Sequence, residues 1–276
     1  MIGLPEVQRI AYRSGVSERM IERDYILTWA LIGLARHPIM GSSAALKGGT
    51  ALKKLYFTDW RYSEDLDFTV QPVVAPDVLQ GYLTAAGRTV HDETGIEFEV
   101  MSSEPRWDGP TLRNVTFYLG YVGPLHRTRR WRELKLDFTF DEVLINPPTR
   151  RPLLSTYSDE PRPAVLVQVY ALEELCAEKL RTLLQRTQPR DLYDVWRIMS
   201  EQADALNLSA LAAIFDAKCR HKNLSPNTLT QVLVPVQIEK LRRAWQTSFA
   251  DQMIDVPPLD QVARETQRAL RSYLAL

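Results

Sequence analysis

Two aspartates separated by one residue are the strongest chemical signal in this sequence. Asp65 and Asp67 alternate with apolar side chains in the run DLDFTV, residues 65–70. A period of two is typical of a strand that turns its apolar residues to a core and the others to the opposite face. The two carboxylates would then stand roughly 6–7 Å apart and repel unless a cation lies between them. Mg²⁺ suits that position, because it takes one or two carboxylates together with phosphate oxygens. The alternative is the solvated face of an edge strand.

A glycine pair upstream favours the metal interpretation. Gly48, Gly49 and Thr50 follow the short apolar run 44–46 and precede a segment of helical character, 51–56. A strand, a glycine turn and a helix start leave backbone N–H groups that bind phosphate, and glycine lets a ligand come close to the backbone. Alone, such a turn is often only a turn. Followed by the two aspartates, it supplies donors for a triphosphate beside ligands for its metal.

A third carboxylate is expected from the segment 131–140. Its leucines and phenylalanines alternate with polar residues, and Asp137 lies on the polar face. If this strand neighbours the first one, Asp137 projects to the same side as Asp65 and Asp67. It then serves as a metal ligand and as the general base for an acceptor hydroxyl. A plain surface position is the alternative.

A lysine lies on the apolar stripe of a helix predicted within 171–184. Lys179 shares that stripe with Leu172, Leu175, Cys176 and Leu183. Because a lysine is costly to bury without a partner, it either reaches out to water or faces an anion such as a triphosphate.

A second helix is predicted to begin at Pro189, a residue suited to the first turn. Arg190, Asp191 and Asp194 follow it closely, where they favour the helix start and surface ion pairs. Asp191 lies at the edge of the apolar stripe, so it could instead hold Lys179 in place.

Four motifs occur in order between residues 46 and 196: GGTALKKLYF with RYSEDLDF, then KLDF, then EELCAEKLRTLLQR, then PRDLYDVW. This set resembles the AbiEii/AbiGii nucleotidyltransferase toxins, which belong to a polymerase-beta-like superfamily of bacterial abortive-infection and toxin–antitoxin proteins. Thr50 stands where the superfamily often has serine, and its hydroxyl can make the same contact.

The resemblance implies an α/β (α+β) fold with a minimal nucleotidyltransferase domain on a mixed sheet, followed by a helical C-terminal domain. The proline- and arginine-rich stretch 146–163 places the boundary near residue 150, giving domains 1–150 and 151–276. The resemblance also implies metal binding by Asp65 and Asp67, with Asp137 as the less uniform third ligand. Nucleotide contacts are expected from Gly48, Gly49, Thr50, Ser63, Lys179 and Arg190, and Asp191 completes the site.

The expected activity is Mg²⁺-dependent transfer of a nucleoside monophosphate from an NTP to an RNA acceptor. The resemblance points to the tRNA 3′ end as acceptor, to growth arrest or phage defence, and to a cognate antitoxin. A phosphate on Ser63 is expected to repel the nucleotide. Two alternatives stay open: modification of an antibiotic-type small molecule or a protein hydroxyl, and a non-catalytic nucleotide- or partner-binding module. The charged set Asp65, Asp67 and Lys179 argues against the second.

Composition agrees with a folded, cytoplasmic protein. The chain has 276 residues, of which 45% are hydrophobic and 25% charged, so it can bury a sizeable core. We expect no membrane span, because no apolar run reaches about 18–20 residues, and no signal peptide is evident. The two cysteines are expected to be reduced. Zero net charge argues against bulk polyanion binding. The arginine cluster 126–132 suits RNA phosphates, or is a solvated hairpin loop.

The coarse pattern predicts the order of elements. Helices are expected at 5–12, 18–37, 76–92 and 259–274, and strands at 44–46, 65–70, 96–101, 113–121, 131–140 and 165–169.

Overall fold

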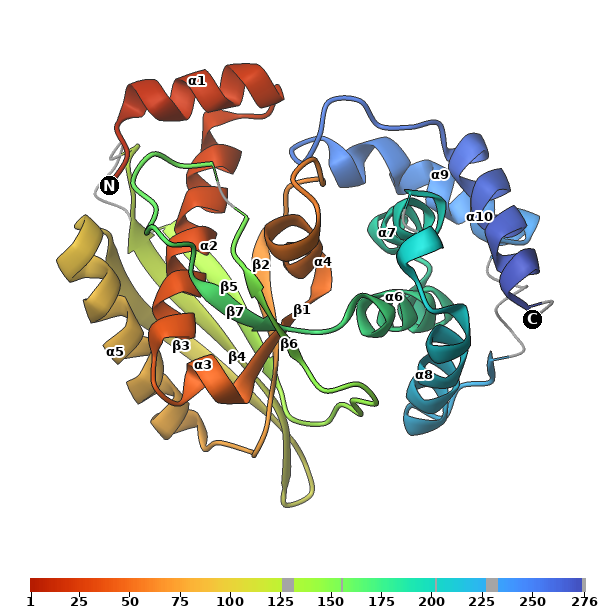
Figure 1. Cartoon of the computed structure of the whole chain (residues 1–276), viewed down its shortest axis with the longest axis horizontal. Coiled ribbons are helices and arrows are strands. Elements are labelled where there is room, and N and C mark those ends of the chain that lie inside the picture. The colour runs from red at the N-terminus through yellow and green to blue at the C-terminus, as the bar shows by residue number, and fades with distance from the viewer. Residues whose placement is uncertain (126–131, 155, 202, 227–232, 275–276) are drawn as a thin grey trace. The chain divides into compact units, whose positions relative to one another are not determined.

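The computed structural model describes residues 1–125, 132–154, 156–201, 203–226 and 233–274. They form two compact units, shown in Figure 1. The first unit comprises Met1–Asp141 and Pro148–Tyr170, and the second comprises Glu142–Pro147 and Ala171–Leu276.

The first unit is built on a seven-stranded mixed sheet with the order β3-β4-β5-β2-β1-β7-β6. Two pairs are parallel, β2 with β5 and β1 with β7, and the remaining pairs are antiparallel. The mixed sheet expected from the sequence is therefore confirmed. The strands are β1 (Ala44–Lys47), β2 (Asp65–Val70), β3 (Glu97–Asp108), β4 (Thr111–Val122), β5 (Arg132–Thr139), β6 (Thr149–Pro152) and β7 (Leu166–Val169).

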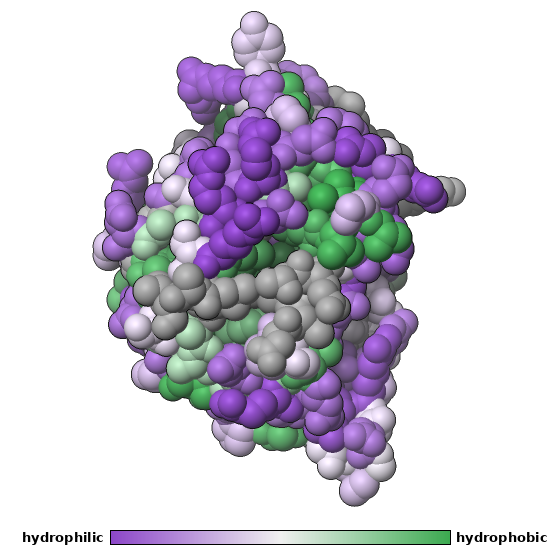
Figure 2. All heavy atoms as spheres, turned by 90° about the vertical axis from the view of Figure 1, so that its right-hand side faces the viewer, coloured by the Kyte–Doolittle hydropathy of each residue, from purple (hydrophilic) through white to green (hydrophobic). Residues whose placement is uncertain are grey.

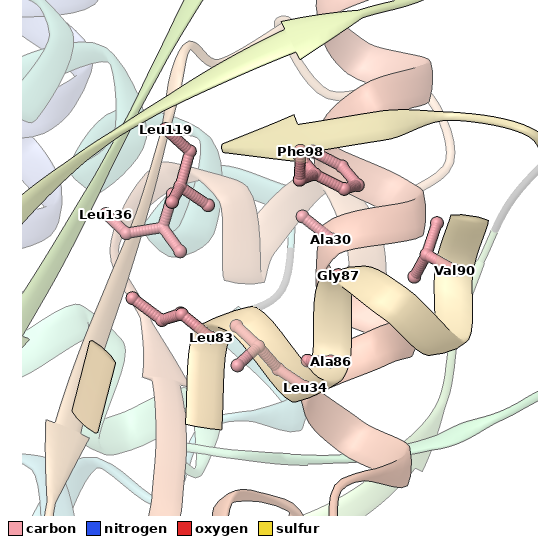
Figure 3. A pocket seen from close by; sticks show the side chains of 9 residues that line it. All are labelled: Ala30, Leu34, Leu83, Ala86, Gly87, Val90, Phe98, Leu119 and Leu136. Atoms are coloured by element: carbon pink, nitrogen blue, oxygen red, sulfur yellow. The ribbon is translucent and has the colours of Figure 1, made fainter. Parts of the chain in front are cut away.

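Two long helices cover one face of this sheet, α2 (Glu18–Arg36) and α5 (Pro76–Thr94). Ser17 caps α2, since its hydroxyl accepts a hydrogen bond from the Met20 N–H. Between the two helices and the sheet lies an apolar pocket of about 20 Å³ (Figure 3). Leu34, Leu83 and Leu136 are among its lining residues. Its size and largely apolar lining make it a packing gap of the core, with room for about one water.

Short helices complete the first unit. They are α1 (Leu4–Ser14), α3 (Met40–Ser43) and α4 (Gly48–Ala51), and α4 continues into a π-helix, Leu52–Tyr56. A π-helical turn directly after a glycine turn is a local irregularity of the kind that often accompanies functional sites.

The structure places the division between the units at Tyr170, which differs from the boundary expected near residue 150. Residues Thr149–Pro152 form the edge strand β6, which pairs antiparallel with β7. Pro152 ends that strand, a position where a proline does not interrupt a central ladder. The proline-rich stretch therefore belongs partly to the sheet, because prolines suit an edge strand as well as a linker.

The second unit is helical, as expected. Its elements are α6 (Leu172–Arg186), α7 (Pro189–Glu201), a 3₁₀ turn (Ala203–Ala205), α8 (Leu208–His221), α9 (Pro235–Phe249) and α10 (Leu259–Leu274). Hydrophobic and hydrophilic residues are interspersed on the face shown in Figure 2. No helix in the described part of the chain is long and apolar enough to cross a membrane.

Buried charges tie the segment Glu142–Pro147 to the helices of the second unit. The Glu174 carboxylate accepts hydrogen bonds from the Ile145 and Asn146 N–H groups at 2.8 and 2.9 Å. Lys218 lies 2.8 Å from the other Glu174 oxygen and donates to the Val143 carbonyl at 3.1 Å. Both side chains are fully buried, so the pair compensates its own charge.

Candidate active site

Strand pairing brings the three predicted carboxylates to one face of the sheet. Asp67 of β2 stands opposite Asp137 of β5, and Asp65 stands opposite Lys135. Side chains of directly paired residues lie on the same face, and the alternate residues of both strands are buried on the helix-covered face. The neighbouring strand β4 places Thr116 beside Asp137. The expected common face of Asp65, Asp67 and Asp137 is therefore present.

Both oxygens of the Asp137 carboxylate are hydrogen-bonded within the protein. Thr116 Oγ1 donates to Oδ1, and Lys135 Nζ donates to Oδ2. Burial lowers the pKa of Lys135, but its bond to Asp137 and the charges of Asp137, Asp67 and Asp65 outweigh this and raise the pKa. Among the residues that the structure describes, no three His, Cys, Asp or Glu side chains form a group that could hold a metal ion. Asp137 is thus bound to a lysine rather than gathered with the other two aspartates.

The glycine turn lies against the second aspartate. Gly48 has a φ of +75°, and a β-carbon there would stand 2.4 Å from Asp67 Oδ2. A β-carbon on Gly49 would stand 2.7 Å from a terminal nitrogen of Arg61. Gly48 is therefore required both by its left-handed backbone and by the carboxylate beside it. The predicted strand, glycine turn and helix start are all present, in β1 and α4.

Two hydroxyls join the glycine turn to the start of β2. Thr50 Oγ1 donates to the Asp65 carbonyl at 2.6 Å and lies 2.5 Å from Ser63 Oγ. Because the Thr50 proton is directed to that carbonyl, Ser63 is the donor to Thr50. Ser63 is only 4% exposed. The Thr50 and Ser63 hydroxyls thus hold Asp65 in position beside the turn.

Two buried cations at this site were not singled out from the sequence. Lys47 ends β1 directly opposite Asp67 and is 6% exposed, and Arg61, beside Gly49, is 4% exposed. A lysine in an otherwise apolar strand and an arginine just before the aspartates were the available signals. Buried cations require anions nearby, so this side of the sheet suits both carboxylates and phosphate.

In the second unit, Lys179 is held by the two aspartates of α7. Its Nζ lies 3.0 Å from Asp191 Oδ1 and 2.9 Å from Asp194 Oδ2. Arg186 Nε lies 2.8 Å from the other Asp191 oxygen. Burial raises the pKa of Asp191, but Lys179 and Arg186 outweigh it and lower the pKa to about 2. The sequence left Asp191 either as a helix-start residue in surface ion pairs or as a partner that holds Lys179. The second interpretation is confirmed.

The remaining predicted residues are placed as follows. Arg190 is exposed in the first turn of α7. Most of the arginine cluster, residues 126–131, lies outside the described residues, while Arg132 pairs with the buried Glu22 of α2. Lys179, Asp191 and Arg190 belong to the second unit and the three sheet carboxylates to the first. The roles of Lys179, Asp191 and Arg190 in nucleotide binding are part of the proposal below.

A mixed sheet with two aspartates beside a glycine turn agrees with a nucleotidyltransferase. A profile of the nucleotidyltransferase AbiEii toxins of type IV toxin–antitoxin systems matches residues 30–273, and the chain belongs to this family. A search of curated protein sequences gives no significant match.

Solved structures share the fold. The nucleotidyltransferase toxin MenT4 from Mycobacterium tuberculosis H37Rv superposes with a TM-score of 0.66 at 18% identity, covering 100% of this chain and 91% of that one. JHP933 from Helicobacter pylori gives a TM-score of 0.55 at 18% identity, covering 94% of this chain and 93% of that one.

Proposed function

We propose that this toxin transfers a nucleoside monophosphate from an NTP to an RNA hydroxyl in a Mg²⁺-dependent reaction, with the tRNA 3′ end as acceptor. The observation that carries the proposal is the contact between Asp67 and Gly48, whose β-carbon position lies 2.4 Å from the carboxylate. A carboxylate beside a glycine turn can hold the metal ion of a nucleotide while the turn binds its phosphates.

The carboxylates fit one Mg²⁺. Asp65 and Asp67 lie on one face of β2, both are only partly buried, and β2 is held against the glycine turn through Thr50. Mg²⁺ is commonly bound by one or two carboxylates with substrate phosphates, so this pair is a sufficient protein contribution. The metal, when bound, neutralises charge on the phosphate under attack.

The phosphates are bound by backbone and cationic groups. The β- and γ-phosphates are contacted by the N–H groups of Gly48 and Gly49 and by the Arg61 guanidinium. Hydrogen bonds to a charged phosphate are stronger than those between neutral groups. Lys179 adds a second cation. Asp191 and Asp194 keep its ammonium in a fixed position, and Arg190 of the same unit contributes a further cation for nucleotide binding.

The acceptor is activated at Asp137, which takes the proton of the attacking hydroxyl. An RNA acceptor agrees with the family, whose members are toxins of type IV toxin–antitoxin systems. Growth arrest then follows from blocked aminoacylation, and a cognate antitoxin opposes it.

The test is transfer of label to total RNA with Mg²⁺ and each α-³²P-labelled NTP in turn. The wild type is compared with Asp67→Asn and with Asp108→Asn, which removes a carboxylate at the exposed tip of β3. We expect a tRNA-sized labelled band from the wild type and Asp108→Asn, but not from Asp67→Asn.

Periodate treatment of the RNA locates the acceptor, since it destroys the 3′-terminal diol. Loss of labelling after treatment supports the 3′ end, and unchanged labelling refutes it. If no NTP labels RNA while an aminoglycoside-type drug or a protein becomes labelled, the small-molecule or protein alternative is correct. If nothing is labelled, the non-catalytic alternative is favoured.

A further inference from the structure

Lys135 is placed among the carboxylates of the site by the sheet register. It stands opposite Asp65, and Asp137 follows two residues later on the same face of β5. Its ammonium is bound to Asp137, and the charges of Asp67 and Asp65 also act on it. A single cationic side chain thus lies within reach of all three aspartates.

Each oxygen of the Asp137 carboxylate already accepts one hydrogen bond in this arrangement. Thr116 donates to one oxygen and Lys135 to the other. Thr116 is buried, and it is itself fixed by the β4–β5 ladder opposite Asp137. A divalent ion that approached Asp137 would be repelled by the Lys135 ammonium bound to the same carboxylate.

An ammonium group and a metal ion can both supply the positive charge that neighbouring carboxylates require. Three carboxylates on one face repel one another, and each positive charge between them relieves part of that repulsion. Lysine supplies one compact positive charge with three donors on a flexible stem. The Lys135 side chain is 44% exposed, so it can follow the movement of a bound nucleotide.

We propose that Lys135 is a built-in cation that takes the place of a second metal ion beside Asp137, so that the site binds a single divalent ion on Asp65 and Asp67. This inference rests on the proposed function and specifies its metal content. Lys135 is a positioning residue: it holds Asp137 toward the acceptor side and excludes a second divalent ion. Its positive charge beside Asp137 also favours the approach of an anionic acceptor.

The test is direct titration of Mn²⁺ into the full-length protein with a non-hydrolysable NTP analogue, followed by the EPR signal of free Mn²⁺. The wild type is compared with Lys135→Met and Lys135→Gln, which remove the charge, and with Lys135→Arg, which keeps it. Arg88→Met is the charge-matched control, because Arg88 is an exposed cation on α5, the helix on the opposite side of the sheet. Thermal unfolding checks that each variant is folded.

We expect one bound Mn²⁺ for the wild type, Lys135→Arg and Arg88→Met. Lys135→Met and Lys135→Gln should bind a second ion, and Asp137→Asn in the Lys135→Met background should lose it. Affinity at the first site should rise about tenfold when the nearby positive charge is removed. Equal stoichiometry and affinity in the wild type and Lys135→Met overturn the inference and leave the proposed function standing. Two ions in the wild type also overturn it, whereas no Mn²⁺ binding by any variant overturns both.

Discussion

The carboxylate of Asp67 lies directly over the backbone of Gly48, with only 2.4 Å between Asp67 Oδ2 and the position that a β-carbon on Gly48 would occupy. This close approach joins Asp67 of β2 to Gly48 of the glycine turn. The two residues are separated in the sequence by α4, the π-helix and a loop. A ligand held by the turn is necessarily held beside the carboxylate. The predictions below start from this contact.

Replacement of Gly48 by alanine should abolish activity. The new β-carbon must displace the Asp67 carboxylate, and the φ of +75° adds backbone strain of about 1 kcal/mol. We expect transfer to fall more than about a hundredfold, as a misplacement of about 1 Å does in catalytic sites. Gly95→Ala is the matched control, since Gly95 also has a φ of +75° but nothing within 4 Å of its β-carbon position. It should lose stability and keep its rate, and an equal loss of rate would refute the argument from contact.

Arg61→Met should weaken binding of the NTP. The guanidinium lies beside Gly49 and is 4% exposed, so it is positioned before any nucleotide binds. Loss of one charge-assisted contact to phosphate should raise KM for the NTP by about tenfold to a hundredfold, corresponding to about 1.5–3 kcal/mol. Arg61→Lys should recover part of this, because it keeps the charge without the planar fork. Steady-state kinetics with varied NTP distinguish this outcome from a change in kcat alone, which would contradict the assignment.

Acid should destabilise the protein partly through Asp191. Its pKa is about 2 in the folded protein, against 3.8 for an ordinary aspartate, because Lys179 and Arg186 outweigh its burial. A lowered pKa contributes stability that is complete above pH 3.8 and is lost as the pH falls toward 2. The contribution is about 2 kcal/mol, from roughly 1.4 kcal/mol per pKa unit.

The measurement is urea unfolding between pH 5 and pH 2 for the wild type and Asp191→Asn. The wild type should lose more free energy of unfolding across that interval than the variant, by about 2 kcal/mol. Identical pH profiles would show that the Lys179–Asp191–Arg186 cluster does not carry the effect.

Ser63 is expected to be the position at which a phosphate stops the reaction. Its hydroxyl is buried and lies 2.5 Å from Thr50 Oγ1, so a negative group there stands between the glycine turn and Asp65. Ser63→Ala removes one neutral hydrogen bond, worth about 1 kcal/mol of stability, and should keep measurable activity. Ser63→Glu removes the same bond and adds a charge, so it should be inactive. Comparable activity in the two variants would refute the electrostatic explanation.

Period-two alternation was enough to predict which residues of β2 and β5 face away from the core. It placed Asp65, Asp67 and Asp137 on one face correctly, because alternation is a local property of a strand. It did not reveal that Asp137 is bound by Thr116 and Lys135. The Thr116 contact depends on the register between β4 and β5, which nonlocal pairing sets. Alternation places Lys135 on the same face as Asp137 but does not show that the two side chains bind each other.

Other parts of the structure could not be predicted from local sequence patterns, because they also depend on nonlocal contacts. The burial of Lys47 and Arg61 depends on strands and turns that meet only in the folded protein. The boundary at Tyr170 could not be read from the prolines of 146–163, since a proline at the end of an edge strand resembles one in a linker. The Lys179–Asp191 pair could be predicted from the sequence, because both residues lie on predicted helices with clear apolar stripes.

The most direct test of the central claim uses one NTP labelled separately at its α- and γ-phosphates, incubated with purified tRNA and Mg²⁺. If the contact between Asp67 and the glycine turn serves nucleotidyl transfer, the RNA should gain label only from the α-labelled NTP, with release of pyrophosphate. Asp67→Asn should gain none, while Asp108→Asn should match the wild type. Label that enters RNA from the γ-phosphate, or that enters equally with Asp67→Asn, would contradict the account.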